Sequence, residues 1–114
     1  MIFLAMPYRH SDTEVVERRV RAGRRAAASL IDSGRSVVSP VVSFHETIQQ
    51  EDAVPKDFEY WETMIEEMIV LSERVYVIMM PGYEDSEGVE REIELARKYK
   101  RPVSYKSVEY FGID

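Results

Sequence analysis

The sequence contains no cysteine, only two histidines, one tryptophan and five glycines among its 114 residues. The absence of cysteine excludes disulfides and thiolate metal sites, and it leaves the redox compartment undetermined. No stretch is long and apolar enough to span a bilayer, and the N-terminus lacks a basic segment followed by an apolar run and a cleavage site. We therefore expect a soluble, cytoplasmic protein with no membrane partner.

Positive charge is also scarce, because 15 lysines and arginines stand against 21 aspartates and glutamates, which gives a net charge of −6. That balance argues against a nucleic-acid-binding protein. Five arginines between Arg18 and Arg25 form a local basic stretch. On an amphipathic helix such a stretch is more often a solvated face or a subunit contact. The length predicts one domain, residues 1–114, that buries roughly two-thirds of its unfolded surface.

The stretch around which the chain is organised begins at residues 74–80, RVYVIMM. Its β-branched, aromatic and apolar composition predicts a strand buried on both faces, as in a parallel sheet. Pro81 and Gly82 end the strand, and Asp85 or Ser86 offers an oxygen that caps a helix beginning near residue 87. A strand, a loop and a helix N-terminus in this order form the place where open α/β sheets bind ligands.

The N-terminal part of the chain repeats this arrangement. Residues 2–6 predict a first buried strand, and Ser11 with Glu14 has the spacing of a capping box that starts a helix, which Gly34 ends. Few residues join this strand to this helix. The side chains between them must therefore lie at the carboxyl end of the first strand, and they are Tyr8, Arg9 and His10.

The remaining elements complete an alternating pattern. Residues 36–42 predict a second strand, residues 43–56 a loop long enough to be a lid or binding segment, and Asp57 the start of a helix. Residues 103–106 predict a fourth strand. The βαβαβαβ order predicts a three-layer flavodoxin-like or Rossmann-like α/β sandwich with a short parallel sheet in the order 2-1-3-4. The loops after the first and third strands then face each other across one crevice.

Glu92 is a charged residue on the apolar side of its predicted helix. A helical wheel puts it within the apolar arc formed by Val89, Ile93 and Ala96, among other residues. Desolvating a carboxylate costs several kcal/mol unless partners or protonation compensate. One interpretation is a structural ion pair or hydrogen bond, and the other is a catalytic carboxylate facing a pocket at the strand ends.

The sequence contains no metal-binding or dinucleotide-binding signature, so we expect no metal and no cofactor. Gly82 and Gly88 do not form the glycine motif of dinucleotide sites. His10 and His45 are weak evidence for a metal because they are far apart in the sequence. Both fall in predicted loops at the ligand-binding edge, where an exposed loop histidine is the alternative to a ligand contact.

Several segments together resemble a small family related to nucleoside 2-deoxyribosyltransferases and (deoxy)nucleoside 5′-monophosphate N-glycosidases. They are FLAMPY at the N-terminus, VVSPVVSFH at the second strand, the Tyr60-Trp61 pair, and VYVIMMPGYEDSEGVEREIELARKYKRPV. The likeness covers nearly the whole chain. Its most specific part is Ser86-x-Gly88-x-x-x-Glu92, which is similar to the S-x-G-x-x-x-E element of the N-glycosidases.

The resemblance implies that Glu92 attacks the anomeric carbon of the sugar, that Ser86 and Gly88 hold the 5′-phosphate, and that the loop after the first strand closes over the nucleotide. A covalent glycosyl-enzyme and a phosphate at a helix N-terminus are both chemically reasonable. It also implies a homodimer. The residues expected to contact the substrate besides Ser86 and Gly88 are Tyr8, Arg9, His10, His45, Trp61 and Gly82.

One position departs from the family. Relatives carry an aspartate on the helix before the central strand, where it assists the sugar hydroxyls and protonates the departing base, and the matching position here is Ile65. Glu62 and Glu66 flank the apolar stripe of that helix and Asp85 stands in the loop, so each is a candidate to substitute, and we expect Asp85 or Glu66 to serve as acid or base. The alternative is that the activity is altered or lost. Base transfer instead of hydrolysis is a close variant. A nucleotide-binding sensor without catalysis, or an interaction module that uses the basic stretch, remains an alternative.

Overall fold

The computed structural model of the protein describes residues 1–52 and 58–113, which form a four-stranded parallel sheet. The strands lie in the order β2-β1-β3-β4, as predicted. They are β1 (Ile2–Ala5), β2 (Val37–Val38), β3 (Arg74–Ile78) and β4 (Val103–Lys106). Strand β1 pairs in parallel with both β2 and β3, so its carboxyl end lies beside that of β3.

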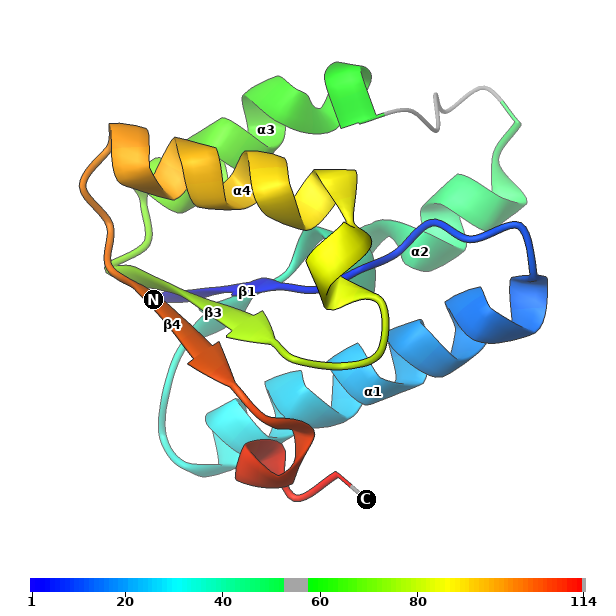
Figure 1. The fold of residues 1–114 in the computed structure, drawn as a ribbon, viewed down its shortest axis with the longest axis horizontal. Coiled ribbons are helices and arrows are strands. Elements are labelled where there is room, and N and C mark those ends of the chain that lie inside the picture. The colour runs from blue at the N-terminus through cyan, green and yellow to red at the C-terminus, as the bar shows by residue number, and fades with distance from the viewer. Residues whose placement is uncertain (53–57, 114) are drawn as a thin grey trace.

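Helices cover both faces of this sheet (Figure 1). Helix α1 (Thr13–Asp32) lies on one face, while α3 (Phe58–Val70) and α4 (Glu87–Lys98) lie on the other. Helix α2 (Pro40–Gln50) packs beside α1. Two short 3₁₀ helices, η1 (Tyr83–Asp85) and η2 (Val108–Phe111), follow β3 and β4. No helix in the described ranges is both long and apolar enough to cross a membrane.

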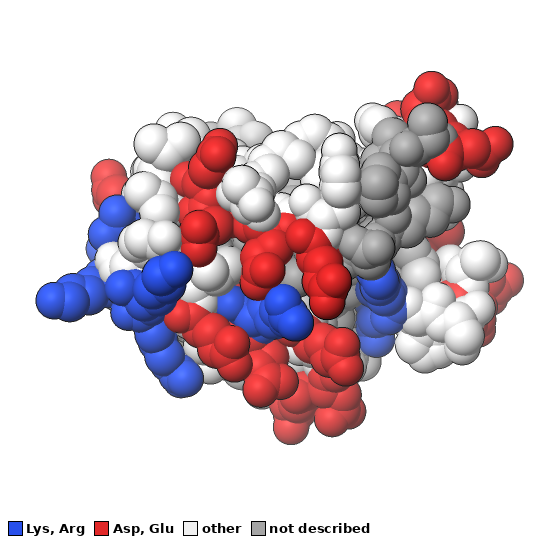
Figure 2. Space-filling model, turned by 90° about the horizontal axis from the view of Figure 1, so that it is seen from above, with Lys and Arg blue, Asp and Glu red and all other residues white. Residues whose placement is uncertain are grey.

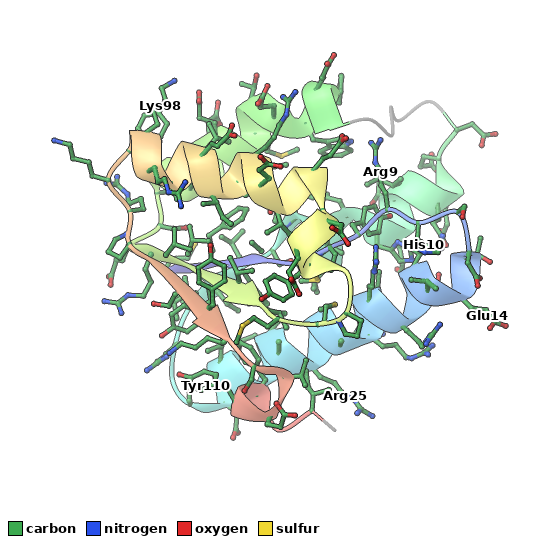
Figure 3. The ribbon with its side chains drawn as sticks, viewed as in Figure 1. Arg9, His10, Glu14, Arg25, Lys98 and Tyr110 are labelled. Atoms are coloured by element: carbon green, nitrogen blue, oxygen red, sulfur yellow. The ribbon has the colours of Figure 1, made fainter. Side chains whose placement is uncertain are left out.

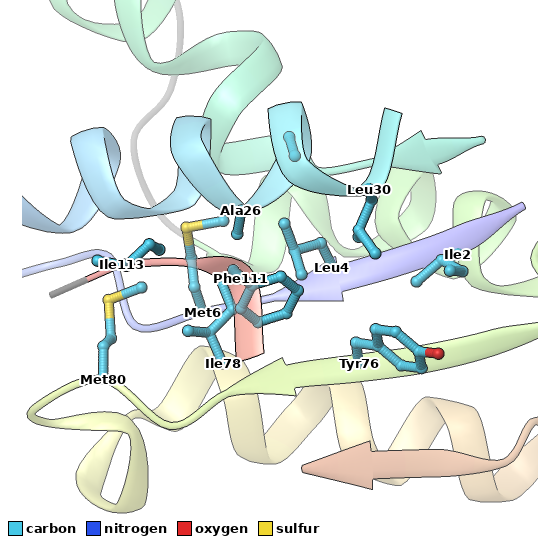
Figure 4. Packing of buried hydrophobic residues seen from close by; sticks show 11 residues of the cluster. Ile2, Leu4, Met6, Ala26, Leu30, Tyr76, Ile78, Met80, Phe111 and Ile113 are labelled. Carbon is cyan, nitrogen blue, oxygen red and sulfur yellow. The ribbon is translucent and has the colours of Figure 1, made fainter. Parts of the chain in front are cut away.

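Alternation along the strands divides the core into two apolar clusters, because successive side chains of a strand point to opposite faces. Ile2 and Leu4 of β1 join the cluster under α1, whereas Phe3 and Ala5 join the cluster under α3 and α4. Figure 4 shows the first cluster, which the C-terminal segment closes with Phe111. The sheet is therefore buried on both faces, as residues 74–80 indicate.

The prediction of a strand over residues 36–42 was wrong after Val38. Strand β2 covers only Val37–Val38, and Pro40 begins helix α2. The Ser39 hydroxyl caps this helix by accepting a hydrogen bond from the Val42 N–H at 3.3 Å. Proline suits the first turn of a helix because its missing N–H needs no partner there. Serine followed by proline was the helix-start signal in this segment.

The predicted loop over residues 43–56 was therefore also wrong in its first half, where α2 continues to Gln50. Residues 53–56 and Asp57, the predicted start of the next helix, lie outside the described residues. At α1 the cap is Asp12 rather than Ser11, since the Asp12 carboxylate accepts from the Glu14 N–H at 2.9 Å. The predicted α4 cap is confirmed, with Ser86 accepting from the Val89 N–H at 3.2 Å.

Candidate functional site

A cavity of about 640 Å³ opens at the carboxyl ends of β1 and β3. The stretch between β1 and α1 and the loop between β3 and α4 both contribute to its wall, as the strand order predicts. Figure 3 shows Arg9 and His10 in the first of these, towards the side where α1 and α4 begin. The expected site residues in the wall are Tyr8, Arg9, His10, Trp61, Gly82, Asp85, Ser86, Gly88 and Glu92.

Two expected site residues lie outside the wall. His45 is buried behind Tyr8, whose hydroxyl lies 2.8 Å from its Nδ1, and its Nε2 lies 3.0 Å from the Glu17 carboxylate. Glu66 forms an ion pair with Lys98 at 3.5 Å and does not line the cavity. The structure thus brings most of the expected residues together, and it separates Glu66 from the rest.

Glu92 lies in the cavity wall and is 6% exposed. Burial raises the pKa of its carboxyl to about 8. No donor among residues 1–52 and 58–113 makes a hydrogen bond or ion pair with it. A structural role for this carboxyl would require a hydrogen-bond or ion-pair partner, and the described residues provide none.

The N-terminus of α4 presents donors to the same cavity. The Ser86 oxygen accepts the capping hydrogen bond from Val89, which leaves its own O–H free to donate. The first N–H groups of any helix lack an intrahelical partner, and Glu87 and Gly88 occupy that turn here. This end of the cavity is therefore suited to an anion.

Arg19 is a cavity residue that the sequence interpretation missed. Its guanidinium donates from Nη1 to the Arg9 carbonyl at 2.8 Å, and its Nε is buried without a partner in the described residues. A Cβ at position 82 would overlap the Arg19 Nη2, and Gly82 has a φ of +94° that favours glycine. Burial lowers the pKa of Arg19. The lack of a side chain at Gly82 therefore leaves room for the Arg19 guanidinium beside the loop between β3 and α4.

The basic stretch is consequently divided between two environments. Arg19 reaches the cavity, whereas the four other arginines of the stretch are exposed, namely Arg18, Arg21, Arg24 and Arg25. Helical geometry explains the division, because residues on opposite sides of one helix cannot share an environment. No local pattern in the sequence indicates which of these arginines faces the cavity.

Aromatic side chains form an apolar part of the wall. Phe44 of α2 lies against Trp61 of α3, with ring centroids 5.3 Å apart and an interplanar angle of 33°. Ile48 and Ile65 also line the cavity. Such a wall suits a flat apolar ring. Phe44 was missed as a site residue because its segment was predicted to be a loop, whereas α2 directs it to the cavity.

The position that carries an aspartate in the resembled family is occupied by Ile65, which is 4% exposed and packs in the core under α3 and α4. Asp85 is exposed where it meets the cavity, and Glu62, which does not line the cavity, pairs with Arg91 at 3.1 Å. No group of three potential metal ligands is found within the part of the chain that the structure describes.

A family model described as a domain of unknown function (DUF1937) matches residues 1–108, and the chain belongs to this family. No curated protein matches the sequence. The family description assigns no activity, so the cavity itself must support any functional assignment.

Proposed function

We propose that this member of the DUF1937 family is an N-glycosidase that cleaves the base–sugar bond of a (deoxy)nucleoside 5′-monophosphate through a covalent glycosyl-enzyme on Glu92. The observation that carries this proposal is the buried Glu92 carboxyl, which faces a cavity and has no partner in the described residues. A buried carboxyl of this kind costs stability. A direct role in chemistry explains why the chain keeps it.

Glu92 suits the role of nucleophile once it is ionised. Attack on the anomeric carbon from the face opposite the base gives a glycosyl ester that water then hydrolyses, as in retaining glycosidases. No hydrogen bond in the described chain competes for its oxygens. Because burial raises the pKa of this carboxyl to about 8, base release should increase as the pH rises towards that value.

The polar end of the cavity supports a phosphate. Ser86, the first backbone N–H groups of α4 and the Arg19 guanidinium all border it. Charge-assisted hydrogen bonds from arginine and from a helix N-terminus are the usual partners of a phosphate. Arg9 adds a second cation to the same wall.

The surface around the cavity argues for a small ligand. Figure 2 shows carboxylates over the middle of the face that α3 and α4 form, with lysine and arginine side chains among them and at the left end. A long polyanion such as nucleic acid would be repelled by this face. A mononucleotide needs to reach only the cations inside the cavity, and its base can lie against the Phe44 and Trp61 rings.

Incubation with a panel of (deoxy)nucleoside 5′-monophosphates, followed by chromatography for free base, tests this proposal. We expect base release from at least one monophosphate, none from Glu92→Gln, and unchanged release from Glu94→Gln, an exposed carboxylate on the same helix. Base appearing in exchange for an added free base would indicate the transfer variant. A wild type that releases no base from any nucleotide would contradict the proposal.

A nucleotide-binding sensor is the second candidate, and the apolar Ile65 at the aspartate position favours it. A sensor would keep the phosphate and base contacts but lack an efficient proton donor for the leaving base. Calorimetric titration of a monophosphate into the wild type distinguishes the two functions. Binding without any base release supports the sensor.

We also propose that the protein is cytoplasmic and forms a homodimer, in which the second subunit completes the open side of the cavity. A chain of 114 residues has little spare wall for a pocket of this volume. Sedimentation equilibrium at micromolar concentration should give a mass near twice 13.3 kDa. A monomeric mass would overturn this part of the proposal without affecting the role of Glu92.

A further inference from the structure

Three side chains form a continuous hydrogen-bonded chain between the surface and the cavity. The Glu17 carboxylate of α1, half-exposed, lies 3.0 Å from His45 Nε2. The His45 ring of α2 is buried, and its Nδ1 lies 2.8 Å from the Tyr8 hydroxyl. Tyr8 lines the same cavity as Glu92. These hydrogen bonds therefore connect solvent with the proposed reaction site.

The proton positions in this chain follow from what each group can do. An ionised carboxylate only accepts hydrogen bonds, so the Nε2 of His45 carries a proton towards Glu17. The Nδ1 then either accepts from the Tyr8 hydroxyl, when the ring is neutral, or donates to the Tyr8 oxygen, when the ring is an imidazolium. The three hydrogen-bonded side chains can therefore hold one additional proton without losing a hydrogen bond. The Glu17 carboxylate compensates the charge that this proton adds to the His45 ring.

Among residues 1–52 and 58–113, the positions at which the resemblance led us to expect an acid provide no buried proton donor in the wall, and His10, which also lines it, is exposed. Ile65 has no proton to give, and Glu66 is outside the wall in an ion pair with Lys98. Asp85 is exposed. Tyr8 is in the wall and is connected to two further titratable groups.

We propose that Glu17, His45 and Tyr8 form a proton path between solvent and the cavity, and that the Tyr8 hydroxyl protonates the departing base. This inference rests on the proposed N-glycosidase function. It assigns the acid role that the aspartate fills in the resembled family to a different part of the fold.

The two chemical steps balance with this assignment. The first step starts from the state in which the His45 ring is an imidazolium. The Glu92 carboxylate bonds to the anomeric carbon while the carbon–base bond breaks, the base takes the Tyr8 proton, and Tyr8 takes the Nδ1 proton from His45, which leaves the ring neutral. In the second, water attacks the anomeric carbon and the bond to Glu92 breaks. The water proton passes to Tyr8, whose own proton returns to Nδ1. One group thus acts first as acid and then as base.

The surroundings of Tyr8 keep its hydroxyl protonated before the base departs. Burial raises the pKa of its hydroxyl above the ordinary value, Arg9 lowers this pKa, and Glu17 raises it. The balance keeps the phenol protonated at neutral pH. The hydroxyl is then a donor in the state in which Glu92 begins the reaction.

Tyr8→Phe, compared on two substrates, tests the path. One substrate is the best monophosphate of the panel, and the other is the 4-nitrophenyl glycoside of the same sugar 5′-phosphate, whose leaving group needs no proton. Single-turnover base release from the nucleotide should fall by roughly 100-fold or more, the usual effect of losing a general acid. Release of 4-nitrophenolate should stay close to the wild-type rate. Tyr105→Phe, the same change outside the cavity, should alter neither rate.

Glu17→Gln is the second variant, because its half-exposed position makes misfolding a poor explanation of any effect. It should slow the nucleotide reaction, by less than Tyr8→Phe does, and spare the nitrophenyl reaction. Equal losses on both substrates in Tyr8→Phe would show a structural role and overturn the path while leaving the function standing. A wild type inert towards both substrates would instead overturn the proposed function, and the path with it.

Discussion

The two faces of the sheet differ in what they bury. Under α1 and η2 the buried cluster is apolar, and the hydroxyl of its Tyr76 accepts a hydrogen bond from Arg35 at 2.9 Å. Under α3 and α4 the apolar cluster borders Glu92, a buried carboxyl that the cavity exposes to a ligand. The cluster under α1 and η2 contains no buried carboxyl, whereas the other cluster borders one that stability does not explain.

The other buried polar side chains sharpen this difference. The Ser72 hydroxyl donates to the Met68 carbonyl at 2.7 Å, Ser39 caps α2, and His45 is hydrogen-bonded on both ring nitrogens. Among the buried polar residues of the described chain, Glu92 is the exception, and outside that group only the Nε atom of the partly buried Arg19 is also buried without a partner there. Unsatisfied buried groups in native proteins call for an explanation, and function is a frequent one. The face under α3 and α4 is therefore where a change should separate stability from activity.

The largest expected effect comes from Glu92→Gln, which should lower base release by several orders of magnitude because it removes the nucleophile. The fold should survive, since no described partner is left unpaired. Quenched-flow assays of base release with circular dichroism of the same sample measure both. Undiminished base release from the variant would refute the nucleophilic role.

The same substitution should change how stability depends on pH. The pKa of Glu92 is about 8 in the folded protein, above its ordinary value of 4.5. Between these values the folded state binds more protons than the unfolded state, so the free energy of unfolding falls as the pH rises. At about 1.4 kcal/mol per pKa unit, the loss at pH 8 is on the order of 4 kcal/mol.

Urea denaturation of wild type and Glu92→Gln at pH 5 and at pH 8.5 measures this loss. We expect similar stabilities at pH 5 and a more stable variant at pH 8.5. The exposed Glu94→Gln serves as the control, and its difference from wild type should not depend on pH in this way. A Glu92→Gln protein that is less stable than wild type at pH 8.5 would indicate a structural partner for the carboxyl.

A substitution under α1 should lower stability and leave ligand binding unchanged. Leu4→Ala removes a side chain that is 1% exposed under α1, and a cost of about 2–5 kcal/mol is typical of such a cavity. Nucleotide affinity of the folded protein should not change, because Leu4 is outside the site wall. Denaturation and calorimetry together test this. A parallel loss of affinity would show that the two faces are not independent.

The sequence predicted the fold well because its signals were local. The apolar run at residues 74–80, the Ser86 cap and the placement of Glu92 within an apolar arc each depend on neighbours along the chain. The error at residues 36–42 has a local cause as well, since β-branched residues outweighed the helix-start signal of Ser39 followed by Pro40.

The rest of the site could not be predicted because it depends on contacts between distant segments. Arg19 enters the cavity only because Gly82 leaves room for it, and the two lie on different elements. His45 meets Glu17 across 28 positions of sequence. Phe44 reaches Trp61 only when α2 is helical. No short-range pattern contains such pairings, since packing decides them.

The smallest effect predicted here compares two serine caps, one at each face. Ser86 caps α4 at the cavity, and Ser107 caps η2 by accepting from the Tyr110 N–H at 3.3 Å, on the side of α1. Replacing either by alanine should lower the free energy of unfolding by about 1 kcal/mol, the typical value of a lost cap. Only Ser86→Ala should also weaken monophosphate binding, by roughly 1–3 kcal/mol, because the Ser86 hydroxyl donates to the phosphate.

Calorimetric titration with the monophosphate and with the unphosphorylated nucleoside measures this loss of affinity, and the nucleoside should bind both variants and the wild type equally weakly. If Ser107→Ala weakens monophosphate binding as much as Ser86→Ala does, then affinity follows stability alone and the α4 N-terminus is not the phosphate site.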